Sequence, residues 1–210
     1  MKTEDLIAAM SADATPQPAV TMRLWRMFPV AVLASLVALL TVWHVRPDLA
    51  VALASPAVIK TLIPAALAGA AFWLAQGLTR PEAKARAQWA VVGVLVLGCV
   101  ALLGRGMIAG GPSGLGAALN SPNLITCFLS IPVLSALPLG AVFWAMRTGA
   151  TSNVWLAGAA AGLLAGAAGA AIYSLHCPED SILFFLPAYG TNVLIMVGIG
   201  TALGPRLLRW

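Results

Sequence analysis

Six long apolar stretches, separated by short polar breaks, run through the 210 residues of this chain. Each holds about the eighteen apolar residues that a helix needs to cross a bilayer. Charged residues make up only 9% of the chain, against roughly a quarter in a soluble domain, so too little polar surface is available to face water. Helices are predicted because lipid satisfies no backbone hydrogen bond, and the short alternating segments of a β-barrel are not seen.

We therefore predict an all-α polytopic membrane protein with two parts. Residues 1–22 form a polar N-terminal tail, and residues 23–210 form a transmembrane domain of six helices. The six predicted spans are Met27–Val45, Thr61–Leu78, Trp89–Met107, Leu124–Ala145, Val154–Tyr173 and Leu183–Leu203.

Lysine and arginine are distributed unevenly between the two sides of these spans. Three lie in the first and third loops, and nine lie in the tail, the second and fourth loops and the C-terminus. The three are Arg46, Lys60 and Arg105; the nine are Lys2, Arg23, Arg26, Arg80, Lys84, Arg86, Arg147, Arg206 and Arg209. The positive-inside rule therefore predicts that both termini are cytoplasmic. The basic residues are dispersed and have no interleaved aromatic residues, so we predict no direct binding of nucleic acid despite the net charge of +5.

The fifth span carries glycine at every fourth position, at Gly158, Gly162 and Gly166. Small residues at this spacing let two helix backbones approach closely in a membrane. The stripe predicts tight packing within the bundle, and a homodimer is the alternative. A second glycine-rich segment, residues 105–123, lacks the Gly-Lys-Ser/Thr ending of a phosphate-binding loop, and we expect a flexible external loop there.

Two of the three cysteines are predicted to meet on the external face. Cys127 lies one turn inside the fourth span, and Cys177 lies just beyond the fifth, so both reach the same depth although fifty positions separate them. Cys99 lies in the middle of the third span, where a small buried hydrophobic residue is the simplest interpretation.

The segment around Cys177 is the densest run of potential ligands in the chain, with His176, Glu179 and Asp180 beside the thiol. Thiolate and imidazole together suit Zn²⁺ or another thiophilic ion, with Cys127, Cys177 and His176 as possible ligands. The two thiols alone suit a reversible Cys127–Cys177 disulfide. An incidental pair of cysteines is the third alternative. A thiol oxidoreductase is disfavoured because the chain contains no Cys-x-x-Cys pair.

The N-terminal tail has the pattern of a short amphipathic helix. Thr3 can cap it, Glu4 and Asp5 in the first turn favour the helix dipole, and Leu6, Ile7 and Met10 share one face. A proline-containing linker follows at residues 15–18. Thr3, Glu4, Asp5, Leu6, Ile7 and Met10 are therefore the predicted partner-binding residues, and a disordered terminus without a partner is the alternative.

Three segments together resemble the NrsF-like family of six-span membrane anti-sigma factors. These are the opening residues 1–7, the context of Cys127 at residues 121–127, and the run His176-Cys177-Pro178-Glu179. The resemblance implies a protein of the bacterial inner membrane that holds an extracytoplasmic-function sigma factor inactive and releases it under oxidative or heavy-metal stress. It also implies that Cys127 and Cys177 form the sensor pair and that the tail contacts the sigma factor.

We accordingly predict a non-enzymatic signalling protein with a sigma factor and the lipid bilayer as its partners. No cofactor is assigned, and the candidates are a thiophilic metal ion such as Zn²⁺ or a Cys127–Cys177 disulfide. Two other classes compete with this interpretation: a small transporter or permease, and a membrane thiol–disulfide redox protein. The span interiors contain almost no ionisable residues, which disfavours a charged translocation path.

Overall fold

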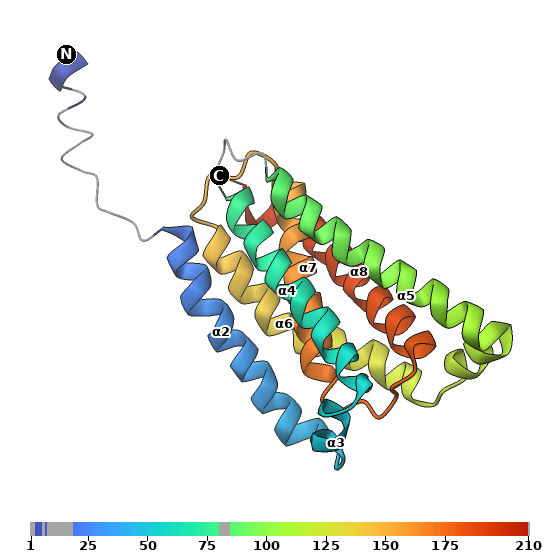
Figure 1. Ribbon diagram of the computed structural model, residues 1–210. Coiled ribbons are helices and arrows are strands. Elements are labelled where there is room, and N and C mark those ends of the chain that lie inside the picture. Colours follow the sequence, from blue (N-terminus) through green and yellow to red (C-terminus); the bar gives the residue numbers. More distant parts are fainter. Residues whose placement is uncertain (1–2, 6, 8–18, 80–84, 210) are drawn as a thin grey trace.

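The computed structural model describes residues 3–5, 7, 19–79 and 85–209, and in this part of the chain it is helical (Figure 1). Five of the six long helices are α4, α5, α6, α7 and α8, and the sixth, α2, ends in a π-helical turn. A short helix, α3, and a 3₁₀ turn connect α2 to α4. The bounds are α2 Val20–Ala38, π-helical turn Leu39–Trp43, α3 Leu49–Leu53, 3₁₀ turn Pro56–Val58, α4 Ile59–Leu78, α5 Arg86–Leu119, α6 Asn123–Met146, α7 Val154–Tyr173 and α8 Ile182–Leu207.

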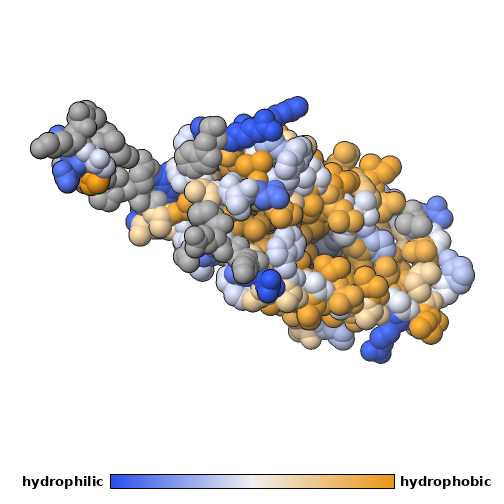
Figure 2. Space-filling model, turned by 90° about the horizontal axis from the view of Figure 1, so that it is seen from above, coloured by the Kyte–Doolittle hydropathy of each residue, from blue (hydrophilic) through white to orange (hydrophobic). Residues whose placement is uncertain are grey.

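Six of the described segments are long and apolar enough to cross a membrane, which confirms the six predicted spans. They are Val20–Trp43, Pro56–Leu78, Arg86–Ala118, Asn123–Met146, Val154–Tyr173 and Ile182–Leu207. Apolar side chains cover much of the flank seen in Figure 2, and hydrophilic groups gather toward its two ends. Large apolar residues such as Val94, Leu97 and Leu194 are more than two-thirds exposed. Hydrocarbon covers such residues in a membrane, whereas water would not favour them.

Helix α7 is the centre of the bundle because its small residues let other helices approach its backbone. A Cβ atom added at Gly162 would lie 2.1 Å from the carbonyl oxygen of Met196, and one added at Gly158 would lie 2.3 Å from that of Gly200. Gly200 and Gly204 of α8 make the reciprocal approach to α7. The glycine stripe is therefore used in packing within the molecule, as predicted, and leaves no room on this face for a second copy.

The expectation of a flexible loop at residues 105–123 is wrong, because α5 continues to Leu119. Gly106, Gly110 and Gly114 recur at every fourth position and lie against the side chain of Leu183 in α8, where Cβ atoms would come within 2.8 to 3.2 Å. The helix is broken once, at Gly111, whose φ of 63° and ψ of −173° suit glycine, immediately before Pro112. These glycines provide helix contacts, which the sequence interpretation mistook for flexibility.

Candidate functional site

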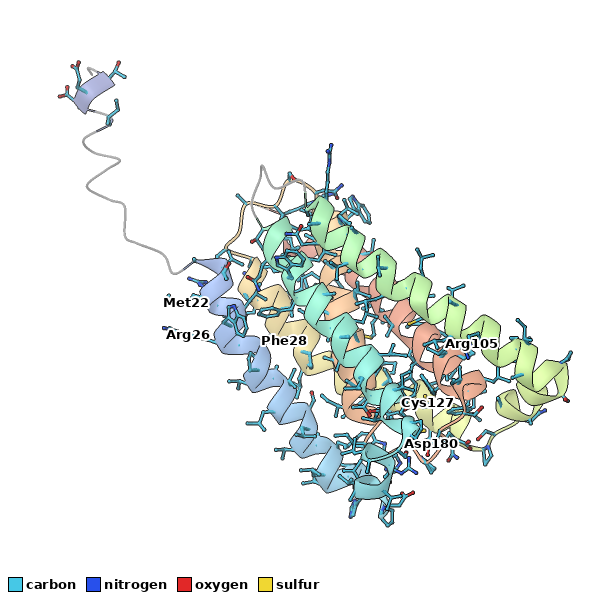
Figure 3. All side chains as sticks on the ribbon, in the orientation of Figure 1. Met22, Arg26, Phe28, Arg105, Cys127 and Asp180 are labelled. Atoms are coloured by element: carbon cyan, nitrogen blue, oxygen red, sulfur yellow. The ribbon has the colours of Figure 1, made fainter. Side chains whose placement is uncertain are left out.

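The two cysteines singled out from the sequence lie in one buried cluster. Cys127 is in the second turn of α6 and Cys177 is in the loop of residues 174–181 between α7 and α8; both are fully buried free thiols. They share a hydrophobic cluster with Tyr173, Phe185 and Tyr189. Figure 3 shows Cys127 and Asp180 near the end of the bundle that is far from the start of α2. The order of the spans predicts this juxtaposition.

A charge cluster, formed by Arg46, Asp48, Lys60 and Asp180, lies beside the thiols. Asp180 bonds to Lys60 Nζ at 2.5 Å and to Arg46 Nη1 at 2.7 Å, and Arg46 Nε bonds to Asp48 at 2.7 Å. Arg46 is 8% exposed and Lys60 is 2% exposed. A cation buried to this extent is costly without a partner, so the carboxylates stabilise the arrangement. The sequence interpretation used Arg46 and Lys60 only to orient the spans and missed their pairing with Asp180.

The same two cations hold the backbone at Cys177. Lys60 Nζ donates to the Cys177 carbonyl at 2.6 Å and to the Glu179 carbonyl at 3.3 Å, and Arg46 Nη1 reaches the Cys177 carbonyl at 3.4 Å. The loop has no regular secondary structure to satisfy these carbonyls, so the buried cations take that role. The position of Cys177 therefore depends on the charge cluster.

The loop of residues 174–181 is also bonded to the segment that follows α2 and its π-helical turn. The Nδ1–H of His176 donates to the His44 carbonyl at 2.9 Å, and the Arg46 N–H donates to the Leu175 carbonyl at 3.1 Å. His44 has a φ of 63°, which is uncommon for a residue other than glycine, and it follows directly on the π-helical turn. The segment that carries Cys177 is thus bonded to the irregular residues at which the first span ends.

A further set of bonds joins the loop to the start of α6. One carboxylate oxygen of Glu179 accepts from Ser121 Oγ at 2.7 Å and from Asn123 Nδ2 at 3.1 Å. Asn123 is the first residue of α6, four positions before Cys127. Glu179 therefore fixes the two thiol-bearing segments relative to each other, a role that sequence reasoning did not assign to it.

Metal coordination gains no support from the described residues, in which no three His, Cys, Asp or Glu side chains are grouped to hold an ion. His176 is engaged with the His44 carbonyl, and Glu179 and Asp180 are engaged as described above. The donor set at the cluster consists of two thiols, which suits disulfide chemistry better than Zn²⁺.

Burial and hydrogen bonds act in opposite directions on the ionisable groups of the loop. Burial raises the pKa of Cys177, while the Glu179 N–H acts in the lowering direction, so the thiol form is favoured at neutral pH. The buried hydroxyl of Tyr189, in the same cluster, has no hydrogen-bond partner among the described residues. Burial also opposes ionisation of Asp180, but the hydrogen bonds from Arg46 and Lys60 outweigh it and lower the pKa of Asp180.

The lowered pKa of Asp180 predicts that acid weakens the loop. A carboxylate whose folded-state pKa is depressed contributes stability above its usual pKa of 3.8 and loses it as the pH falls through the folded value. We expect thermal stability of the purified protein to fall below about pH 4. In the Asp180→Asn variant this acid-dependent loss should be smaller, and an unchanged pH profile in that variant would contradict the assignment.

The tail residues are only partly within the described structure. Residues 3–5 and 7 are helical and exposed. Thr3 is itself helical in the structure, whereas the sequence analysis predicted it as the cap before the helix. Leu6 and Met10, two of the predicted apolar contacts, lie outside the described residues.

Residues 9–210 match the family model described as negative regulator of sigma F, NrsF. The chain belongs to this family. It is 35% identical to the anti-sigma-F factor NrsF of Caulobacter vibrioides and 34% identical to a probable anti-sigma-F factor NrsF of Azospira oryzae, in both cases over the full length of both chains. No solved structure matches the chain. The family resemblance inferred from the opening residues and the two cysteine segments is thereby confirmed.

Proposed function

We propose that this chain is a membrane anti-sigma factor that holds an extracytoplasmic-function sigma factor inactive through its N-terminal segment. Membership of the NrsF family and the names of its full-length relatives support this function. Oxidation of Cys127 and Cys177 on the opposite side of the membrane is the proposed signal for release. A thiophilic metal ion that bridges the same thiols is a second form of this signal.

The proposed location is the bacterial inner membrane, with both termini in the cytoplasm. The start of α2 and the end of α8 lie at the same end of the bundle (Figure 1), as six crossings require. Most of the arginines of the described chain flank this end of the spans: Arg23, Arg26, Arg86, Arg147, Arg206 and Arg209. The positive-inside rule then puts the tail on the side where a sigma factor acts, and the thiols on the oxidising side.

The observation that carries the proposal is the set of bonds between the thiol-bearing segments and α2, the helix that leads back to the tail. The Cys177 loop bonds through His176 and Leu175 to His44 and Arg46, in the segment that directly follows α2 and its π-helical turn. On the Cys127 side, α6 accepts a hydrogen bond from Ser35 of α2 at the Leu134 carbonyl and one from Trp43 at Ser130, both at 2.8 Å.

A disulfide requires the two Cα atoms to come within about 7 Å with a defined geometry. Closing it changes how α6 and the loop sit relative to each other, and both are bonded to α2 or to the segment that follows it. The bundle then has two arrangements, and the redox state of the thiols changes their relative free energy. Signalling across the membrane requires such a pair of arrangements. We propose that α2 transmits this difference to the tail.

Deletion of residues 2–14 should abolish retention of the sigma factor. The apolar face of the tail supplies the proposed contact, so the tagged full-length protein should co-purify with a soluble sigma factor from solubilised membranes and the deleted form should not. A chain truncated after Leu208 is the matched control, since it loses residues at the same end of the bundle and should retain the partner. Retention by the deleted form would place the binding surface elsewhere.

A further inference from the structure

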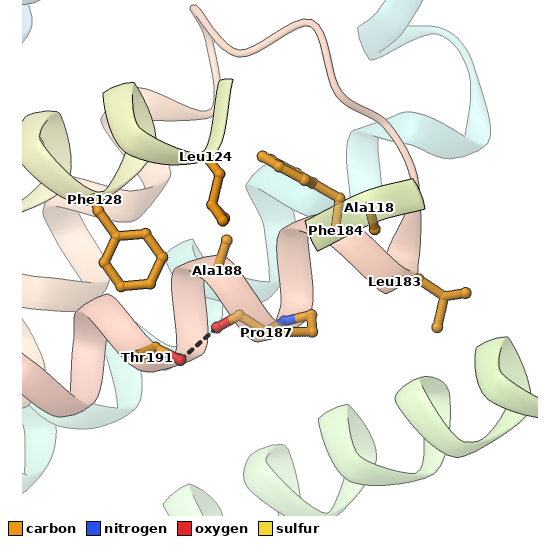
Figure 4. A pocket seen from close by; sticks show the side chains of 8 residues that line it. All are labelled: Ala118, Leu124, Phe128, Leu183, Phe184, Pro187, Ala188 and Thr191. Carbon is orange, nitrogen blue, oxygen red and sulfur yellow. Dashed lines mark hydrogen bonds between the residues drawn. The ribbon is translucent and has the colours of Figure 1, made fainter. Parts of the chain in front are cut away.

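A large apolar cavity lies among the spans and has no part in the proposed signalling mechanism. Its volume is about 390 Å³, within the range of cavities that hold small ligands. One wall is formed by α5 at residues 95–103 and the opposite wall by α8 at residues 185–194, with α4 and Leu163 of α7 completing it. A smaller cavity of about 120 Å³ lies on another side of α8, toward α6, and shares Pro187 and Thr191 with it (Figure 4).

The large cavity opens sideways, toward the lipid. Val96, Val100 and Leu194 belong to its lining and are 46%, 60% and 69% exposed. These residues lie within membrane-spanning segments, so their exposed surface faces hydrocarbon. The molecules that reach the opening are therefore those dissolved in the interior of the bilayer.

The lining selects an apolar occupant. None of the described residues that line the cavity is charged, and the hydroxyl of Thr191 is already bonded to the Pro187 carbonyl at 2.8 Å (Figure 4). A water molecule needs two to four polar partners, and the unpartnered hydroxyl of Tyr189 in the lining supplies only one. An empty space would deprive the lining of dispersion contacts, so apolar atoms are the favoured filling.

We propose that this cavity binds one acyl chain of a bilayer phospholipid, which wedges between α5 and α8. Acyl chains are flexible and wholly apolar, and they are the main component of the bilayer at this depth. Phe185 and Tyr189 line the cavity and also belong to the cluster that contains Cys127 and Cys177. The bound chain therefore packs against the aromatic wall of the thiol cluster.

A photoactivatable lipid tests the proposal directly. The full-length protein is reconstituted in vesicles of phosphatidylethanolamine and phosphatidylglycerol that contain a phosphatidylglycerol with a diazirine midway along one acyl chain. After irradiation, peptide mass spectrometry locates the cross-links. We expect inward-facing positions such as Cys99 and Tyr189 to be labelled, and an excess of unlabelled phospholipid to remove this labelling.

The glycines of α8 provide a matched pair of variants. Gly190 lines the cavity and Gly198 does not, and a Cβ atom at either position meets nothing within 4 Å, so a side chain at neither position begins against a neighbouring helix. Gly190→Leu should fill the space and abolish labelling at Cys99 and Tyr189, while Gly198→Leu should leave it unchanged. In both variants the outer position Leu97 should be labelled as in the wild type, which reports intact folding and insertion.

Three outcomes would overturn the proposal. The first is labelling of the inward positions that is no stronger than that of residues buried in α7. The second is inward labelling that survives in Gly190→Leu. The third is displacement of the label by a membrane quinone with an isoprenoid tail but not by unlabelled phospholipid, which would show that another lipophilic molecule occupies the cavity.

Discussion

The Gly162→Leu variant is expected to lose the folded bundle. Even a Cβ atom at this position would lie 2.1 Å from the Met196 carbonyl oxygen and 2.8 Å from the Val197 Cα, both of them backbone atoms of α8. A side chain cannot displace backbone without separating the two helices, and the α7–α8 contact is the centre of the structure. We expect destabilisation above about 4 kcal/mol, the range that is exceptional for one substitution.

The measurement is the yield and thermal stability of monodisperse protein in detergent. The control is Gly98→Leu, because Gly98 lies in membrane-spanning α5 and a Cβ atom there meets nothing within 4 Å. The control should purify like the wild type. If Gly162→Leu were as stable as Gly98→Leu, the packing of α7 against α8 described above would be wrong.

The Asp180→Asn variant is expected to loosen the loop that holds Cys177. It removes the charge that pairs with Lys60 and leaves Arg46 with Asp48 alone. Breaking a buried pair costs about 3–5 kcal/mol, and because the Asp180 side chain is 38% exposed we expect a smaller loss of about 2 kcal/mol. Lys60 and Arg46, which also donate to the Cys177 carbonyl, then lose the carboxylate that fixes them, so the buried Cys177 thiol should react faster with a small maleimide than it does in the wild type.

Asp48→Asn is the matched control for this effect. Asp48 is 56% exposed and bonds only to Arg46 within the charge cluster, which keeps Asp180 in this variant. The rate of Cys177 labelling should therefore stay close to the wild-type rate. Equal acceleration in both variants would show that the loop responds to any loss of charge rather than to the Asp180 pairs.

The number and approximate position of the spans follow directly from the sequence because hydrocarbon imposes one strong requirement, namely a long apolar helix. The close packing at the glycine stripe of α7 could likewise be predicted, because small residues at every fourth position of a membrane helix mainly allow another helix to approach closely. The order of the spans also places Cys127 and Cys177 at one end of the bundle without any information on packing.

The contacts that organise the site could not be predicted from the sequence in this way. Lys60 and Asp180 are 120 positions apart, and Arg46 and Asp180 are 134 apart, so no local pattern joins them. One signal was available: buried cations near an external segment need carboxylates, and Glu179 and Asp180 stand together in the external loop. The glycines of residues 105–123 were misjudged because glycine indicates a loop in water but close helix packing in lipid.

The central claim is that a disulfide between Cys127 and Cys177 controls a sigma factor bound on the other side of the membrane. The most direct measurement is the fraction of sigma factor retained by the purified full-length protein in lipid nanodiscs, before and after oxidation with hydrogen peroxide, with the disulfide verified by mass spectrometry. The wild type should retain the partner when reduced and release it when oxidised, whereas the Cys127→Ser and Cys177→Ser double variant should retain it in both conditions. Retention by the verified disulfide form, or equal release from the double variant, would contradict the account.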